Sequence, residues 1–138
     1  MALGQRTNAR PETVAWLTRY YELLDQNLVG DAIREFIADR CTVRFGNREP
    51  TSFLDEARRM SKYVKAVRHQ LTSVFEGDDG SLACELEITY IKHDGSSVTL
   101  PGALFARVEN GRFIEQHAYI DHGPLLSTKG HANVVEHP

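Results

Sequence analysis

Cysteine is scarce in this sequence: the 138 residues include only two, Cys41 and Cys84, and neither lies in a CxxC pair or at a spacing typical of a zinc site. Small secreted domains that depend on disulfides carry more cysteines than this. The scarcity disfavours a disulfide scaffold and a structural zinc module. We expect both thiols to be reduced and buried in a cytoplasmic protein.

Long apolar runs, excess positive charge and phosphate-binding loops are also missing. No window approaches the roughly 20 apolar residues of a membrane span, and the N-terminal segment MALGQRTNARPE has no apolar core of signal-peptide length. The net charge of −3 disfavours nucleic-acid binding, which usually requires a basic balance. No glycine-rich phosphate loop and no nucleophile-elbow serine motif occurs. We therefore expect neither a membrane nor a nucleic acid among its partners.

Helical periodicity is present in the first part of the chain. Pro11 suits the first turn of a helix, and apolar residues follow at spacings of three and four, so the pattern predicts a helix over 11–26. Two shorter helices are predicted at 29–39 and 51–64, with a strand at 41–45 between them. The third helix begins with a capping-box pattern at Ser52 and Asp55.

Strand-like runs divided by turn sequences follow after residue 66. They lie at 67–77, 81–95, 96–111 and 112–121, and GDDG, HDGS and ENGR separate them. In the second run apolar and polar residues alternate, which predicts that Glu85 and Glu87 lie on an outer face. Pro101 and Gly102 predict a bulge or a bend in a curved sheet.

Helices followed by an antiparallel meander indicate a single α+β domain. We expect this domain to span residues 11–126. The flanking segments, 1–10 and 127–138, are expected to be a flexible N-terminus and a loose C-terminal tail.

The segment RFIEQHAYIDHGPL raises the central question about function. Strand alternation places four polar groups on one side of it, namely Glu115, His117, Tyr119 and Asp121. If that side faces the helices, it forms one wall of an acid–base pocket. If the side with Ile114, Ala118 and Ile120 faces the helices, the pocket loses its acid and a binding role is favoured. A single bulge would exchange the two sides, so the alternation leaves both possibilities open.

Each polar candidate also has a purely structural explanation. Asp121 can cap the turn at HGPL, since Asp commonly bonds the backbone two residues on. His117 can be a surface or dimer-contact residue, and His69 a partly buried histidine with a satisfied hydrogen bond. Glu115 can pair with an arginine across a hairpin. No metal site is expected, because His122 has the wrong strand parity to share ligands with Glu115 and His117.

The order of elements, ααβαββββ, resembles the NTF2-like superfamily, whose α+β fold is a cone. The resemblance covers about residues 12–125 and is strongest in RYYELLDQNLVGDAIREFIADRCTV and ARVENGRFIEQHAYID. It implies three N-terminal helices packed on a curved antiparallel sheet, and a homodimer formed through the outer face of that sheet. It does not fix an activity, because the superfamily includes both enzymes and non-enzymes.

Two enzyme types of this superfamily are disfavoured at the matching positions. Ketosteroid isomerases use an Asp base on the first strand and a second acid on a later strand, where this sequence has Phe45 and Leu104. Only their helix tyrosine has a counterpart here, Tyr20. Limonene-epoxide hydrolases need carboxylates on neighbouring strands, and none occurs between Gly95 and Val108.

SnoaL-like cyclases and scytalone-type dehydratases resemble the sequence better. The resemblance implies a general acid or base at Asp121 and a cavity-facing histidine at His69. His117 is a further candidate base or acid, while Tyr20 and Tyr119 are candidate hydrogen-bond donors. The expected apolar lining of the pocket consists of Trp16, Tyr20, Leu24, Phe36, Phe45, Leu86, Ile88 and Phe105.

These observations favour a cofactor-free enzyme that moves protons on a small, mostly apolar, carbonyl-bearing metabolite. Cyclisation, isomerisation and dehydration all use these proton-transfer groups, so the sequence does not separate them. The alternative is a non-catalytic module of the same fold that binds a ligand or a partner protein.

Overall fold

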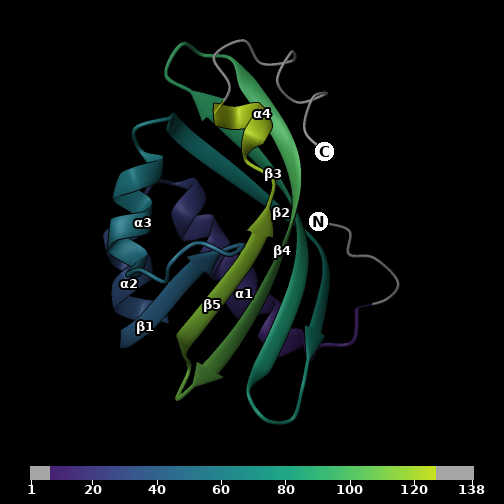
Figure 1. The fold of residues 1–138 in the computed structure, drawn as a ribbon. Helices are drawn as coiled ribbons and strands as arrows, with labels where there is room; N and C mark the ends of the chain where they lie inside the picture. Colours follow the sequence, from purple (N-terminus) through teal and green to yellow (C-terminus); the bar gives the residue numbers. More distant parts are fainter. Residues whose placement is uncertain (1–6, 127–138) are drawn as a thin grey trace.

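The computed structural model describes residues 7–126, which form four helices and five strands (Figure 1). The elements are, in chain order, α1 (Pro11–Asp25), α2 (Val29–Phe36), β1 (Ile37–Phe45), α3 (Phe53–Met60), β2 (Val64–Glu76), β3 (Ser81–Lys92), β4 (Ser97–Glu109), β5 (Arg112–Ile120) and α4 (Gly123–Leu126). Every helix and strand predicted from the sequence is present, and the short α4 is additional. None of the helices within this range is long and apolar enough to cross a lipid bilayer.

The strands form one sheet in the order β1-β5-β4-β3-β2. β1 runs parallel to β5, and the other neighbouring pairs are antiparallel. Figure 1 shows that the sheet curves and that α1, α2 and α3 lie on one side of it. The predicted α+β fold, with three N-terminal helices on a curved and mostly antiparallel sheet, is confirmed.

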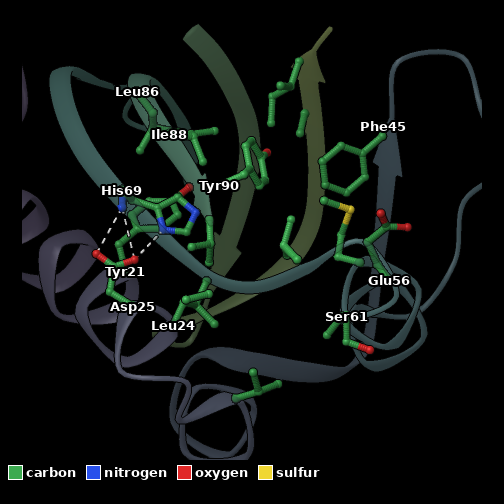
Figure 2. Close-up of a pocket in the computed structure, with 18 of the residues that line it drawn as sticks. Tyr21, Leu24, Asp25, Phe45, Glu56, Ser61, His69, Leu86, Ile88 and Tyr90 are labelled. Carbon is green, nitrogen blue, oxygen red and sulfur yellow. Dashed lines mark hydrogen bonds and ion pairs between the residues drawn. The ribbon is translucent and has the colours of Figure 1, made fainter. Parts of the chain in front are cut away.

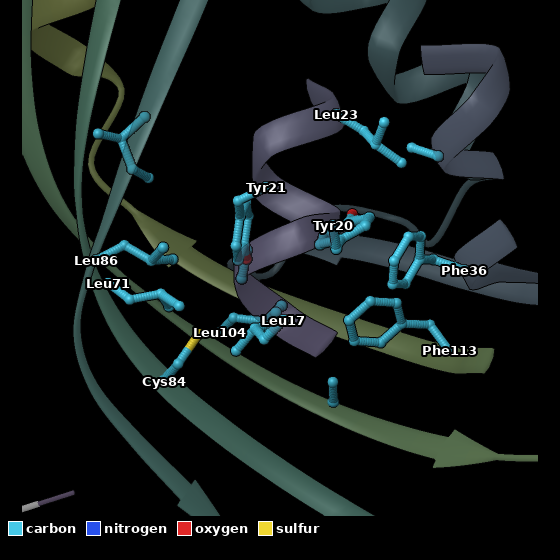
Figure 3. Close-up of a cluster of buried hydrophobic side chains, with 14 of the residues drawn as sticks. Leu17, Tyr20, Tyr21, Leu23, Phe36, Leu71, Cys84, Leu86, Leu104 and Phe113 are labelled. Carbon is cyan, nitrogen blue, oxygen red and sulfur yellow. The ribbon is translucent and has the colours of Figure 1, made fainter. Parts of the chain in front are cut away.

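Helix α1 makes the main hydrophobic contact between the helices and the sheet. Its inner face carries Leu17 and Tyr20, which are almost completely buried. The ring of Tyr20 lies 5.5 Å from that of Phe36 on α2 and 4.9 Å from that of Phe113 on β5 (Figure 3). Tilted aromatic pairs at such distances add to the stabilisation from buried area. This cluster fixes α1 and α2 against the sheet.

Two element boundaries differ from the predicted ones. α2 ends at Phe36, and the backbone is extended from Ile37 onward because Ile37 pairs with Phe113 in the parallel ladder. Tertiary pairing thus overrides a helical pattern that continued to residue 39. α3 begins as predicted, with the Ser52 hydroxyl accepting the backbone N–H of Asp55 at 3.1 Å, but it ends at Met60.

Gly102 has a packing role instead of marking a bulge. The β3–β4 pairing continues without a register shift through Pro101 and Gly102, so of the two predicted features, a bulge or a bend, the bulge is absent at that point. A Cβ atom at Gly102 would lie only 2.7 Å from Cγ1 of Ile120 on β5 and 3.1 Å from Cδ1 of Ile88 on β3. The glycine therefore leaves room for both isoleucine side chains above position 102.

The segment before α1 contacts the edge of the sheet. The backbone N–H of Asn8 donates to the carbonyl of Val74 at 3.0 Å, and Arg10 forms an ion pair with Glu76. Residues 7–10, expected to belong to a flexible N-terminus, thus run beside β2. The remaining parts of the terminal predictions, residues 1–6 and 127–138, lie outside the described residues.

Candidate functional site

A cavity of about 430 Å³ lies between the helices and the inner face of the sheet. The apolar part of its wall includes Leu24, Val43, Phe45, Phe53, Met60, Val64, Leu86, Ile88, Leu104 and Ile120. Figure 2 shows side chains from α1, α3 and several strands converging on it. An apolar wall of this size with a few polar groups is typical of a small-molecule site.

His69 and Asp25 form a polar pair in this wall. Asp25 is the last residue of α1, and its Oδ1 lies 2.7 Å from Nδ1 of His69 on β2 (Figure 2). The same carboxylate accepts the backbone N–H of His69 at 3.0 and 3.1 Å. β2 lies at the edge of the sheet, where an outward N–H needs a partner, and Asp25 supplies it. The pair therefore joins α1 to β2 and orients the imidazole.

This contact decides which nitrogen of His69 is available for chemistry. A carboxylate can only accept, so neutral His69 carries its proton on Nδ1 and keeps a lone pair on Nε2. The ring of Tyr21 lies 4.5 Å from that of His69 and holds its plane. The His69 side chain is 11% exposed and lines the cavity. Its geometry is that of a general base oriented by a carboxylate.

A second polar pair, Tyr90 and His122, lines the same cavity. The Tyr90 hydroxyl lies 2.9 Å from Nε2 of His122, which follows the end of β5. On the sheet, His69 is opposite Ile88, two residues from Tyr90, and diagonal neighbours of this kind are about 7–8 Å apart. Burial raises the pKa of Tyr90 above its ordinary value, so the phenol stays protonated. A neutral phenol thus lines the same cavity as the histidine base.

The side of β5 that faces the helices is not the one that carries Asp121. Arg107 pairs with Glu115 but Val108 pairs with Phe113, so Ile114 is an extra residue in β5. This bulge reverses the alternation: Phe113 is buried, and beyond the bulge the even-numbered residues face inward. The inward residues after the bulge are Gln116, Ala118 and Ile120, and all three line the cavity.

The expected acid–base wall on β5 is therefore wrong in its placement. Asp121 is exposed, and its Oδ1 accepts the backbone N–H of Gly123 at 2.9 Å, which is the turn-capping role. His117 lies on the outer face, where Nδ1 is 3.0 Å from a guanidinium nitrogen of Arg44 and Nε2 is 2.8 Å from the carbonyl of Gly46. Tyr119 is 48% exposed on the same face. None of these three side chains lines the cavity.

The remaining candidates divide between the cavity, the core next to it and the surface. Phe45, Leu86 and Ile88 line the cavity as expected, and so does Tyr20, whose hydroxyl accepts a hydrogen bond from Nε2 of Gln116 at 3.1 Å. Leu24 also lines it. Burial raises the pKa of Tyr20, although the bond from Gln116 opposes this.

Three expected lining residues lie elsewhere. Trp16 packs against Phe36 and Phe113 in the aromatic cluster, so Trp16 and Phe36 belong to the core next to the cavity. Phe105 is 53% exposed on the outer face of β4, because β4 alternates and its inward neighbour is Leu104.

Sequence reasoning missed Asp25, Tyr90 and His122. A carboxylate in the last turn of a helix opposes the helix dipole, so Asp25 should have indicated a partner elsewhere in the fold. Tyr90 lies in the alternating run 81–95 on the same side as Leu86 and Ile88, and a buried phenol normally needs a partner for its hydroxyl, which indicates a further polar group nearby. The position of His122 depends on the turn after β5 and has no such signal. Within residues 7–126, no three His, Cys, Asp or Glu side chains gather closely enough to share a metal ion.

Comparison with known proteins gives a fold but no sequence relative. No protein-family profile and no curated protein matches the sequence. Among solved structures, AclR from Streptomyces galilaeus, a candidate hydroxylase, superposes with a TM-score of 0.70 at 16% identity, covering 86% of this chain and 80% of AclR. An NTF2-like protein from Burkholderia pseudomallei K96243 has a TM-score of 0.67 at 15% identity, covering 81% of this chain and 92% of its own. The chain has the NTF2-like fold.

Another structural neighbour is a candidate SnoaL-like polyketide cyclase from Jannaschia sp. CCS1. Its TM-score is 0.66 at 14% identity, and the match covers 83% of this chain and 91% of the cyclase chain. Identities this low establish the fold alone. The NTF2-like fold accounts for the cavity between helices and sheet, whereas the chemistry depends on the residues within it.

Proposed function

We propose that this NTF2-like protein is a cofactor-free acid–base enzyme that acts on a small, mostly apolar ligand with a carbonyl group. The observation that supports this is the His69–Asp25 pair in the wall of a mainly apolar cavity. The candidate hydroxylase and cyclase among its structural neighbours support a small-molecule substrate. Isomerisation, dehydration and cyclisation are the reactions that such a site can perform.

In the proposed mechanism, Nε2 of His69 removes a proton from the carbon next to the carbonyl. Asp25 stabilises the imidazolium that results, and the carbonyl oxygen becomes an enolate that accepts a hydrogen bond from Tyr90. Return of the proton to another carbon isomerises the ligand. In dehydration the His69 imidazolium gives its proton to the departing β-hydroxyl group, which leaves as water. In cyclisation the enolate carbon attacks a second carbonyl, and the imidazolium protonates the alkoxide that forms.

Proton exchange on β-tetralone, a two-ring ketone with acidic α-hydrogens, tests the proposal without knowledge of the natural substrate. The ketone is incubated with the protein in deuterium oxide, and loss of its α-proton signals is followed by NMR. We expect the wild-type protein to accelerate deuteration and His69→Gln to lose about 100-fold or more of that acceleration. His117→Gln is the matched control, since His117 lies outside the cavity, and it should keep the wild-type rate.

Two results would contradict the enzyme proposal. If His69→Gln deuterates β-tetralone as fast as the wild-type protein, His69 is not the base. Binding of β-tetralone by the wild-type protein without any accelerated deuteration would favour the alternative, a non-catalytic ligand-binding module. The mainly apolar cavity and the outward position of Asp121 support that alternative.

We also propose that the working form is a cytoplasmic homodimer that pairs through the outer face of the sheet. Phe105 and Tyr119 are about half exposed there, with ring centres 5.9 Å apart in an edge-to-face contact. Arg107 lies opposite Glu115 on the same face, so both charge signs are available for a self-complementary two-fold contact. The free, buried thiols of Cys41 and Cys84 support a reducing compartment.

A further inference from the structure

Helix α3 carries a glutamate where an apolar residue is expected. Phe53, Glu56 and Met60 follow a spacing of three and four and all line the cavity. Glu56 is 5% exposed and is the one buried residue of α3. A buried carboxylate is costly unless it is paired, so its partners define its role.

Two arginines bind this carboxylate from outside the cavity. A guanidinium nitrogen of Arg48 lies 3.1 Å from Oε1 of Glu56, and one of Arg59 lies 2.9 Å from Oε2. The side chains of Arg48 and Arg59 are 43% and 29% exposed, and neither lines the cavity. Arg48, Glu56 and Arg59, here called the ion cluster, therefore carry two positive charges and one negative charge.

Stability alone does not explain why a glutamate occupies this position. A buried ion pair gains little over well-packed apolar residues, because desolvation offsets the Coulomb attraction. Leu or Met at position 56 would continue the apolar stripe of α3 and need no arginine. The excess positive charge is the property that an apolar residue could not provide.

The ion cluster lies behind the Tyr90–His122 end of the cavity. The guanidinium carbon of Arg48 is 5.9 Å from the centre of the Phe45 ring, and that ring is 5.5 Å from the ring of His122. Burial lowers the pKa of His122 below its ordinary value, the charges of Arg59 and Arg48 lower it further, and the charge of Glu56 opposes them. The charge of Glu56 likewise adds to burial in raising the pKa of Tyr90. His122 is thereby kept neutral next to the Tyr90 hydroxyl.

We propose that the ion cluster stabilises the negative charge that develops on a ligand oxygen bound by the Tyr90 hydroxyl, whose own oxygen accepts the Nε2–H of His122. Arg59 and Arg48 act as positioning residues through their field, and Glu56 sets its strength by cancelling one of the two positive charges. Further charged groups are Asp121, next to His122, and Asp25 and Lys65, which line the cavity. This inference rests on the proposed function, because it assigns the anion to the enolate.

The test uses β-naphthol, whose ring system and hydroxyl imitate the enol of β-tetralone. Its ionisation constant in the bound state is measured by absorbance as the pH is raised. We expect Arg59→Met to lower that ionisation constant about three- to tenfold, because one positive charge of the ion cluster is lost. Glu56→Gln should raise the constant by a similar factor, because the negative charge is lost. Arg58→Met is the matched control, because Arg58 lies on the same helix, pairs with Asp55 and is 71% exposed.

Opposite changes in the two variants are a result that a purely structural role would not produce. Equal changes in the same direction, or no change in either, would overturn the inference. If Arg59→Met does not fold, Arg48→Met should give the same decrease. His69→Gln separates the two proposals: the ion-cluster inference requires that it keep the wild-type ionisation constant, whatever happens to deuteration of β-tetralone.

Discussion

Two aspartates show that position decides the role of a side chain in this molecule. Asp25 ends α1 and its carboxylate fixes the tautomer of His69 in the cavity. Asp121 lies one residue beyond β5 and bonds the backbone of Gly123 instead. The two have the same chemistry, yet only Asp25 lines the cavity.

Replacement of Asp121 separates these roles by experiment. We expect Asp121→Ala to lower the free energy of unfolding by about 1 kcal/mol, because the N–H of Gly123 loses its acceptor. Deuteration of β-tetralone should be unchanged, since the side chain is outside the cavity. Urea unfolding and the NMR assay measure the two effects. Asp121→Asn keeps an acceptor oxygen and should restore stability. A large loss of β-tetralone deuteration in either variant would show that Asp121 takes part in the reaction.

The side of the sheet on which a residue lies could be predicted from the sequence where the strand alternates regularly. Leu86 and Ile88 follow the regular alternation of β3, and both line the cavity. The partner of His69 could not be predicted in this way, because Asp25 is 44 residues away and the contact depends on how α1 crosses the edge of the sheet. Side-chain pairs between separate elements depend on packing that local patterns do not encode.

At the scale of elements, one extra residue in β5 decides which groups enter the cavity. A strictly alternating β5 with Phe113 inside would place Glu115, His117 and Tyr119 inside as well. Ile114 interrupts the pairing with β4, and the inward side then carries Gln116, Ala118 and Ile120. The sequence shows that a bulge would matter, but the bulge itself depends on pairing between strands and leaves no local pattern.

The segment before α1 is attached to β2 by a contact that should depend on pH. Arg10 and Thr13 donate hydrogen bonds to the carboxylate of Glu76. The side-chain bond from Arg10 is the largest reason why the pKa of Glu76 falls from about 4.5 to about 2. A carboxyl group with a lowered pKa stabilises the fold above its unfolded pKa and loses that contribution as the pH falls.

As the pH falls from about 5 to about 2, we therefore expect the unfolding temperature of the wild-type protein to decrease more than that of Glu76→Gln. Thermal unfolding at a series of pH values measures this difference. Arg10 is 70% exposed, so solvent screening makes the effect modest. Glu49→Gln, a change at an exposed loop residue, is the control and should follow the wild-type curve. Parallel curves for wild type and Glu76→Gln would show that the Arg10 contact contributes nothing to stability.

At the scale of the whole molecule, the layers could be predicted and the cavity only in part. The switch from helical to alternating periodicity near residue 66 gives the order of elements, and the α+β layers follow from that order. The cavity, however, depends on how α1 and α3 pack over the curved sheet, and α3 ends earlier than its pattern suggests. The outer face of the sheet could be predicted as exposed, since Glu85 and Glu87 do lie there.

That outer face gives the prediction at this scale, which concerns assembly. If Phe105 and Tyr119 pair with a second copy, the wild-type protein is a dimer in sedimentation velocity, and Phe105→Lys is a monomer because it places like charges opposite each other at the two-fold contact. Leu54→Lys is the matched control: Leu54 is 41% exposed but lies on α3, so the dimer should persist. Binding of β-naphthol should survive in Phe105→Lys, since Phe105 does not line the cavity. A wild-type monomer, or a dimer that tolerates Phe105→Lys, would place the assembly surface elsewhere.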